Sequence, residues 1–188
     1  FCIFEYIYFS RPDSVIDNKL VYDVRKRIGE ELARETFIDS DMVVPVPDSG
    51  NVAALGYANQ SKIPFELGLT RNHYIGRTFI EPTQQIRNLG VKLKHSAMRL
   101  FKDKVITIID DSIVRGTTAK KIINLIRNAG AKEIHMRISS PLITGPCWYG
   151  IDTPNRKELI AGTSNEKEIG EFIGADSLKY LSVEGLHK

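Results

Sequence analysis

Residues 105–118 constrain the fold of this chain more than any other segment. The run at 105–109 is short, apolar and mostly β-branched, which is typical of a strand buried on both faces of a parallel sheet. Two neighbouring carboxylates, Asp110 and Asp111, follow it, and a turn then leads into a helix that we expect to begin at Thr117. A strand that ends in acids and turns into a helix is typical of an α/β fold.

This unit also suits a ligand that is both anionic and hydroxylated. The open amides at a helix N-terminus attract phosphate. Carboxylates at the end of a strand accept hydrogen bonds from sugar hydroxyls or hold a hydrated Mg²⁺. The alternative is an ordinary strand-to-helix connection with an Asp/Ser turn. We favour the ligand site, because two neighbouring acids are not expected to face together into an apolar core.

The rest of the chain alternates between strand-like and helix-like segments. This order predicts an α/β fold with a mostly parallel, twisted sheet flanked by helices. The aromatic-rich segment 2–9 has strong β propensity, and we expect it to be a strand. Further strands are expected at 42–46, 65–69, 133–139 and 177–182, and helices at 18–35, 51–60, 117–129, 155–161 and 165–172.

A second strand–loop–helix unit has a small polar loop made of Pro47, Asp48, Ser49 and Gly50. Small residues let backbone amides approach an anion closely. The loop alone fits an ordinary turn equally well. Its position after a strand favours binding, because open α/β sheets bind ligands at the carboxyl ends of their strands.

Residues 71–98 form a long basic segment in which Glu81 is the only acid. The segment has no clear periodicity, and such long loops in compact domains are often lids over active sites. A basic lid would close over a polyanionic substrate and exclude water. The alternative is a solvated basic surface loop.

Composition limits the class of protein. The chain has 188 residues, of which 42% are hydrophobic, and this fits a single globular domain over residues 1–188. The net charge of +3 argues against general nucleic-acid binding. No apolar run approaches the roughly 20 residues that span a bilayer, and the opening segment lacks a basic n-region. Two cysteines are too few for a disulfide scaffold, so we expect reduced thiols in a cytoplasmic protein.

Residues 110–118 read Asp-Asp-Ser-Ile-Val-Arg-Gly-Thr-Thr and resemble the phosphoribosylpyrophosphate (PRPP) signature of the type I phosphoribosyltransferases. Further segments narrow the resemblance to the carboxy-terminal domain of the amidophosphoribosyltransferases, and the likeness covers essentially the whole chain. The resemblance implies the type I fold with a small hood formed by terminal segments. It also implies transfer of the phosphoribosyl group of PRPP to ammonia, giving 5-phosphoribosylamine and pyrophosphate in the first committed step of purine synthesis. The further segments are residues 5–14, 44–50, 76–80 and 149–152.

The resemblance also implies roles for single residues. Asp110 and Asp111 would contact the ribose hydroxyls and the Mg²⁺ shell, with Ser49 beside the metal. Residues 47–50 would hold the pyrophosphate, and residues 115–118 would wrap the 5-phosphate with backbone amides and threonine hydroxyls. The substrate-binding candidates are Pro47, Asp48, Ser49, Gly50, Asp110, Asp111, Ser112, Arg115, Gly116, Thr117 and Thr118. The catalytic candidates are Arg71, His73, Tyr74 and Arg77 in the lid, where Tyr74 and Ile80 would line an apolar path for ammonia.

The chain departs from the family pattern in the lid. The family commonly reads Lys-Asn-Arg-Tyr where this chain has Arg71, Asn72, His73 and Tyr74. The first change keeps a cation but alters its geometry. The second replaces a permanent charge with one that titrates near neutrality.

The resemblance implies partners that this chain does not itself supply. The family has a glutamine-hydrolysing domain with an N-terminal cysteine nucleophile, and Cys2 does not fit that role because it follows Phe1 in a strand-like segment. We therefore expect this chain to use free ammonia without glutaminase activity, and to pack in its parent enzyme against the glutaminase domain and in a homo-oligomer. Some family members also hold a [4Fe–4S] cluster through four cysteines. Cys2 and Cys147 resemble two of these ligands, so we expect a cluster in the intact parent but none here; the alternative is two buried thiols.

Two other functions remain open. A regulator that senses PRPP would keep this fold but would need a DNA-binding module. A base-salvage phosphoribosyltransferase would share residues 110–118 but should lack the matches at 5–14 and 149–152. The nucleophile that the enzyme accepts separates these alternatives.

Overall fold

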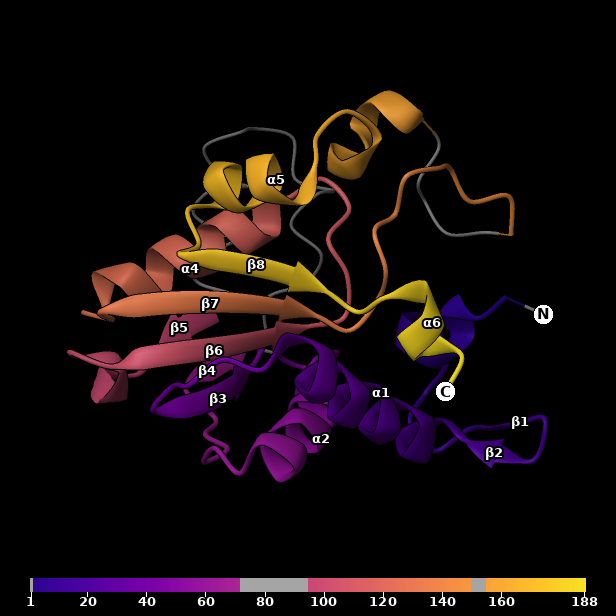
Figure 1. Ribbon diagram of the computed structural model, residues 1–188, viewed down its shortest axis with the longest axis horizontal. Coiled ribbons are helices and arrows are strands. Elements are labelled where there is room, and N and C mark those ends of the chain that lie inside the picture. The colour runs from indigo at the N-terminus through magenta and orange to yellow at the C-terminus, as the bar shows by residue number, and fades with distance from the viewer. Residues whose placement is uncertain (1, 72–94, 150–154) are drawn as a thin grey trace.

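A parallel four-stranded sheet forms the centre of the molecule in the computed structural model, which describes residues 2–71, 95–149 and 155–188 (Figure 1). The strand order is β3-β6-β7-β8, and every neighbouring pair is parallel. This arrangement confirms the fold class that the alternating pattern predicts. The strands are β3 (Met42–Pro45), β6 (Val105–Asp110), β7 (Glu133–Ile138) and β8 (Ser177–Tyr180).

Helices cover both faces of the sheet, which explains why its strands are apolar on both sides. One pair of helices packs on the face below the sheet in Figure 1, and the other pair lies above it. Each interface has its own apolar core, one including Leu32, Tyr57 and Ile109 and the other including Ile122, Ile134 and Ile173. The lower pair is α1 (Val21–Thr36) and α2 (Asn51–Ser61), and the upper pair is α4 (Thr117–Asn128) and α5 (Glu166–Ile173).

Two glycines let α1 and α2 approach closely. A Cβ on Gly29 would lie 1.9 Å from the carbonyl oxygen of Ala53, and one on Gly56 would lie 2.0 Å from that of Lys26. Both distances are far below van der Waals contact, so neither position accepts a larger residue without separating the helices.

A buried arginine ties the end of α1 to the sheet. Arg137 of β7 is 3% exposed, and its Nε donates to the carbonyl oxygen of Thr36 at 2.8 Å. The hydroxyl of Tyr57 donates to the same carbonyl at 3.2 Å. Because the last carbonyls of a helix lack partners within the helix, these two donors stabilise its buried C-terminus.

The aromatic N-terminal segment is helical, so the strand expected there is wrong. Residues Glu5–Phe9 form a π-helical turn, η1, against α1. Arg25 of α1 explains the difference, because its guanidinium donates to the carbonyl oxygens of Tyr6 at 2.6 Å and Ser10 at 2.7 Å. These hydrogen bonds from a residue distant in the sequence take the place of those that a neighbouring strand would make. A propensity scale for single residues cannot include them.

Two other expected elements also differ from the structure. Only the two ends of the strand expected at 65–69 have β structure: Phe65 forms a single bridge with Val43, and Leu69 begins β4. The helix expected at 155–161 is two 3₁₀ turns, η4 (Arg156–Glu158) and η5 (Ile160–Gly162). The remaining small elements are β1 (Val15–Ile16), β2 (Lys19–Leu20), β4 (Leu69–Arg71), β5 (His95–Ala97), η3 (Arg99–Phe101) and α6 (Val183–Leu186).

Two antiparallel ribbons, β1-β2 and β4-β5, lie outside the main sheet. The ribbon of β4 and β5 forms the base of the expected lid, because it pairs the residues on either side of 72–94. The resemblance implied a hood formed by terminal segments; from here on, the name hood denotes residues 155–164 alone, which contain η4 and η5. They lie above the start of α4 in Figure 1. Within the described part of the chain, no helix has the length and apolar character needed to cross a membrane.

Candidate functional site

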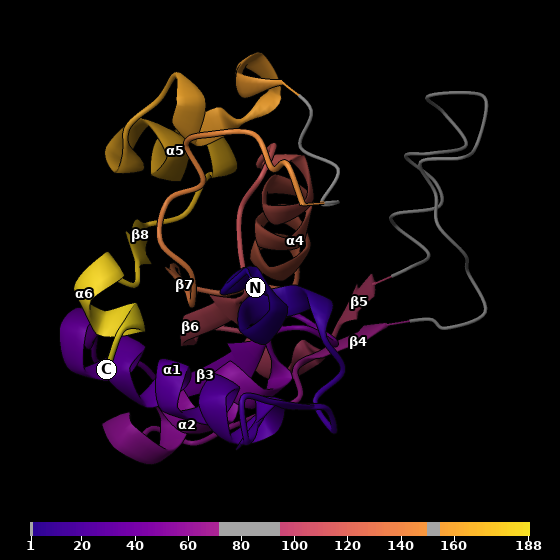
Figure 2. The same ribbon diagram turned by 90° about the vertical axis from the view of Figure 1, so that its right-hand side faces the viewer.

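The two candidate loops leave the sheet side by side. Pro45 at the end of β3 pairs with Ile109 of β6, and the amide of Val46 donates to the carbonyl oxygen of Ile109 at 2.8 Å. Residues 47–50 and 111–116 therefore begin at the same edge, where the strand arrows end in Figure 1. Figure 2 looks at this edge and shows the N-terminal segment beside it. The parallel register thus brings together two segments that are about 60 residues apart in the chain.

Both acids of the signature are enclosed, contrary to the expectation that neighbouring acids would not be buried together. Asp110 is 7% exposed and Asp111 is 6% exposed. Hydrogen bonds make this possible: Asp110 Oδ1 accepts from the amide of Asp111 at 2.9 Å, and Asp111 Oδ2 accepts from the hydroxyl of Ser112 at 2.5 Å. Burial, and next the charge of Asp111, raise the pKa of Asp110 well above its usual value.

This pair of acids fits a magnesium ion held together with a phosphorylated substrate. Mg²⁺ is usually bound through one or two carboxylates, with water and substrate phosphates completing its shell. Within residues 2–71, 95–149 and 155–188, no three His, Cys, Asp or Glu side chains form a cage for a metal ion. Two buried carboxylates that repel each other would be stabilised by a nearby cation, so their chemistry suits the ion.

Gly50 packs the 47–50 loop against the neighbouring strand. A Cβ at this position would lie 2.4 Å from the carbonyl oxygen of Ile109 and 2.9 Å from that of Val46. The amide of Gly50 donates to the Val46 carbonyl at 2.9 Å, so it is used within the loop. This hydrogen bond turns the Gly50 amide back into the loop, and glycine is needed here for the close approach of two backbones.

Arg71 connects the base of the lid to the 47–50 loop. Its Nη1 donates to Asp48 Oδ2 at 2.9 Å, and both side chains are partly exposed. The Nε of Arg71 is buried and has no partner among the described residues. The structure therefore brings one catalytic candidate into contact with one substrate-binding candidate. His73, Tyr74 and Arg77 lie outside the described residues.

The turn before α4 has the geometry of an anion-binding helix start. Gly116 has a φ of 72°, in the left-handed region that favours glycine. No side chain caps the first amides of α4, and Thr117 and Thr118 at its start are exposed. Unpaired amides and hydroxyls at a helix N-terminus suit a phosphate.

Two residues at the end of β7 are missing from the candidates found in the sequence. The amide of Ser139 donates to the carbonyl oxygen of Asp110 at 2.9 Å, which places this strand end beside the acids. Ser140 is 1% exposed, and its hydroxyl has no partner among the described residues. The position of these serines at the carboxyl end of a third parallel strand was the signal that pointed to them.

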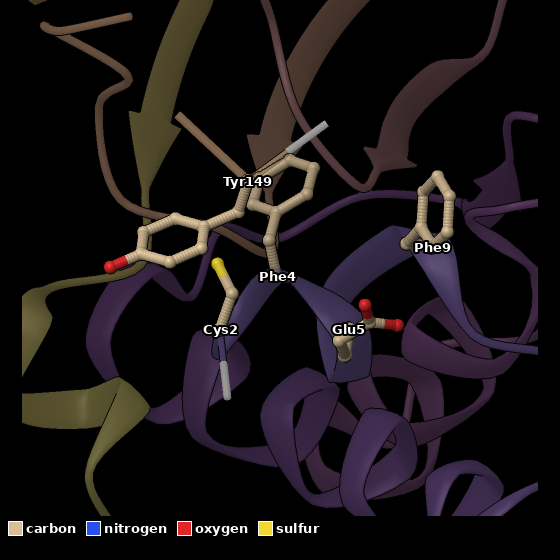
Figure 3. A pocket seen from close by; sticks show the side chains of 5 residues that line it. All are labelled: Cys2, Phe4, Glu5, Phe9 and Tyr149. Carbon is tan, nitrogen blue, oxygen red and sulfur yellow. The ribbon is translucent and has the colours of Figure 1, made fainter. Parts of the chain in front are cut away.

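Cys2 lines a small hollow at the N-terminal end of the chain (Figure 3). Phe4, Glu5, Phe9 and Tyr149 form the rest of its lining, and its volume is about 30 Å³. The amide of Tyr149 donates to Cys147 Sγ at 3.3 Å, so the loop that carries the second cysteine reaches the same region. The chain has two cysteines, whereas a [4Fe–4S] cluster needs four thiolates, so these residues alone do not fit the group.

The chain matches the model of a known protein family. A family model described as a phosphoribosyl transferase domain matches residues 13–139, which is more than half of the chain. The chain belongs to the phosphoribosyl transferase domain family. The match includes the 47–50 loop and residues 110–118, and the hood lies beyond it.

The relatives of this phosphoribosyl transferase domain are longer proteins. The amidophosphoribosyltransferase of Rhizobium etli is 57% identical over 189 residues, covering 100% of this chain and 38% of the relative. The amidophosphoribosyltransferase of Methanocaldococcus jannaschii is 55% identical over 188 residues, again covering 100% of this chain and 40% of the relative. The chain therefore spans about two fifths of the length of these relatives.

Two solved structures share the fold. One is the glutamine PRPP amidotransferase of Bacillus subtilis in complex with ADP and GMP, with a TM-score of 0.90 and 53% identity, covering 98% of this chain and 41% of that one. The other is described as the allosteric regulatory enzyme of purine biosynthesis, with a TM-score of 0.89 and 53% identity, covering 98% and 40%. These neighbours confirm the fold that the resemblance implied.

Proposed function

We propose that this domain transfers the phosphoribosyl group of PRPP to ammonia, as the phosphoribosyltransferase part of an amidophosphoribosyltransferase. The meeting of the 47–50 loop, the acids at 110–111 and the open start of α4 at one edge of the sheet carries this proposal. Together they offer sites for a pyrophosphate, a ribose and a 5-phosphate. The names of relatives at 53–57% identity support the same reaction.

The residues would act mainly by orienting the substrate. Asp110 and Asp111 would accept hydrogen bonds from the ribose hydroxyls, and the amides and hydroxyls at Gly116, Thr117 and Thr118 would hold the 5-phosphate. Displacement of pyrophosphate from C1 builds positive charge on the sugar and negative charge on the leaving group. Arg71, held by Asp48 beside the loop, would stabilise that negative charge.

Asp110, Asp111 and Ser49 would hold the Mg²⁺. The ion would supply electrostatic stabilisation of the pyrophosphate as it leaves. The acids need not remove a proton, because ammonia is already a sufficient nucleophile; their task is positioning. The lid residues His73, Tyr74 and Arg77 remain candidates for closing the site.

The parent enzyme would supply the ammonia. We propose that a glutaminase domain of the same parent chain releases ammonia from glutamine, and that the parent is a cytoplasmic homo-oligomer. Supporting this, the Bacillus subtilis neighbour is described as a glutamine PRPP amidotransferase. A [4Fe–4S] cluster that includes Cys2 and Cys147 in the parent remains a prediction from the family.

Pyrophosphate release from PRPP and Mg²⁺ tests the proposal, with ammonia, hypoxanthine, orotate or glutamine as the second substrate. We expect release with ammonia and none above background with the two bases or with glutamine. Consumption of a base without any reaction with ammonia would identify a salvage enzyme. Release of glutamate from glutamine would contradict the assignment of glutaminase activity to another domain.

A further inference from the structure

The loop of residues 114–116, which leads into α4, is attached to the hood. Both the Nε and the Nη2 of Arg115 donate to Glu158 Oε2, at 3.0 and 2.5 Å. The same loop is joined through its backbone, because the amide of Ile160 donates to the carbonyl oxygen of Val114 at 2.9 Å. A side-chain ion pair and a main-chain hydrogen bond thus connect two consecutive loop residues to the hood.

Apolar contacts also join the hood to Gly116, the residue directly before α4. A Cβ on Gly116 would meet Ile160 Cδ1 at 3.0 Å and Phe172 Cε1 at 3.1 Å, so the hood and α5 lie directly against the turn. Lys120 of α4 lies over the ring of Phe172, 4.4 Å from its centroid. The amides that would hold the 5-phosphate therefore lie on a turn that packs against the hood and α5.

We propose that Glu158 is a positioning residue that holds the 115–118 turn for the 5-phosphate through Arg115. The inference rests on the proposed function, and it assigns the side chain of Arg115 to the hood and its backbone to the substrate. Glu158 lies outside residues 13–139, the part matched by the family model. It is also 43 residues from Arg115 in the chain, so the signature alone does not point to it.

The opposite hypothesis is that Arg115 leaves Glu158 and binds the phosphate directly. Both side chains are a little under half exposed and line a hollow of about 330 Å³, so the pair is accessible to solvent. The two hypotheses predict opposite effects on phosphate binding when the Glu158 charge is removed. If Glu158 positions the turn, its loss weakens phosphate binding; if it competes with the phosphate, its loss strengthens binding.

The KM for PRPP in the ammonia-dependent reaction distinguishes them. We expect Glu158→Gln to raise this KM about three- to fivefold, which is the size that coupling through a half-exposed ion pair permits, with kcat nearly unchanged. Arg115→Gln should raise KM by a similar factor. The double variant should show no further rise in KM, because the two single substitutions remove the same interaction.

Glu166→Gln is the matched control. Glu166 pairs with Lys179 at 2.6 Å in the same half of the molecule, and the substitution removes the same charge without touching the turn. We expect no change in its KM. A KM that falls or stays constant in Glu158→Gln, or that rises equally in Glu166→Gln, would overturn the proposal.

Calorimetric titration with ribose 5-phosphate separates this inference from the proposed function. The titration requires no ammonia transfer, and the expected order of affinities is wild type and Glu166→Gln above Glu158→Gln. Wild-type protein that binds ribose 5-phosphate in this order but does not react with ammonia would contradict the reaction and leave the positioning role supported. Equal affinities in all three proteins would contradict the positioning role.

Discussion

At the scale of single residues, Asp110 is a carboxyl group in an environment that disfavours its charge. Its carboxyl group is enclosed at the end of β6, next to a second carboxylate and beside the loop that follows β3. Such an arrangement lowers stability in the absence of ligand, because a buried charge loses its hydration. Groups of this kind are concentrated at functional sites, where they are kept for the substrate.

Asp110→Asn should stabilise the free protein at neutral pH while lowering its activity. Because burial raises the native pKa of Asp110 above its unfolded value, the native state binds this proton more tightly, and stability falls as the pH rises from the unfolded pKa through the native one. Each unit of that shift is worth about 1.4 kcal/mol. Urea unfolding at pH 5 and pH 8 should therefore show a larger advantage of the variant at pH 8.

Asp103→Asn is the control for that experiment, since it removes the same charge from an exposed side chain. We expect its effect on the free energy of unfolding to be similar at both pH values. An Asp110→Asn protein that is less stable than wild type at pH 8 would show that the carboxylate is not destabilised by burial.

The sequence singled out Asp110, Asp111 and residues 115–118 as candidates because their residue types fit a single chemistry, and their roles stay predictions. It did not predict the partner of Arg115, because an ion pair between residues 115 and 158 depends on the path of the chain through the hood. Ser140 was missed for a related reason. A serine is common in any loop, and this one follows Ser139, whose amide donates to the carbonyl oxygen of Asp110.

At the scale of elements, the 47–50 loop depends on a glycine that allows two backbones to approach. Gly50→Ala would force its Cβ to within 2.4 Å of the carbonyl oxygen of Ile109, so the loop must move away from β6. We expect a loss of about 1–3 kcal/mol in the free energy of unfolding, as for other overpacked sites, together with a higher KM for PRPP. Thermal unfolding and steady-state kinetics measure the two effects.

Gly145→Ala is the matched control, because a Cβ at this glycine would have no atom within 4 Å. It should change neither the melting temperature nor the KM. If Gly50→Ala behaves like this control, the 47–50 loop does not depend on its close approach to β6.

The four strands of the main sheet and the four helices that cover it were predicted within a few residues, since their apolar periodicity reflects the two cores. α1, α4 and β7 are examples. The N-terminal segment was not, because Arg25 supplies the partners for its carbonyl groups and makes a turn more favourable than a strand. The hood also differed from the expected helix, and it too has a long-range backbone partner: the amide of Ile160 donates to the carbonyl oxygen of Val114, next to the 115–118 turn.

At the scale of the whole molecule, the order of the parallel strands creates the site. β3 and β6 are neighbours although α2 and the lid segment separate them in the chain, so their loops meet at one edge. The hood and α5 then support the 115–118 turn from above, in the view of Figure 1. We propose that these loops form one site for PRPP and Mg²⁺.

Calorimetric titration of this chain with PRPP, with and without Mg²⁺, tests that proposal. We expect a single site whose affinity depends on Mg²⁺ and falls at least tenfold in a variant with both Asp110→Asn and Asp111→Asn, since each carboxylate would contact the ribose or the ion. The Asp103→Asn variant should bind like wild type. Binding that is independent of Mg²⁺, or that is unchanged when both acids are replaced, would contradict a shared site for PRPP and Mg²⁺.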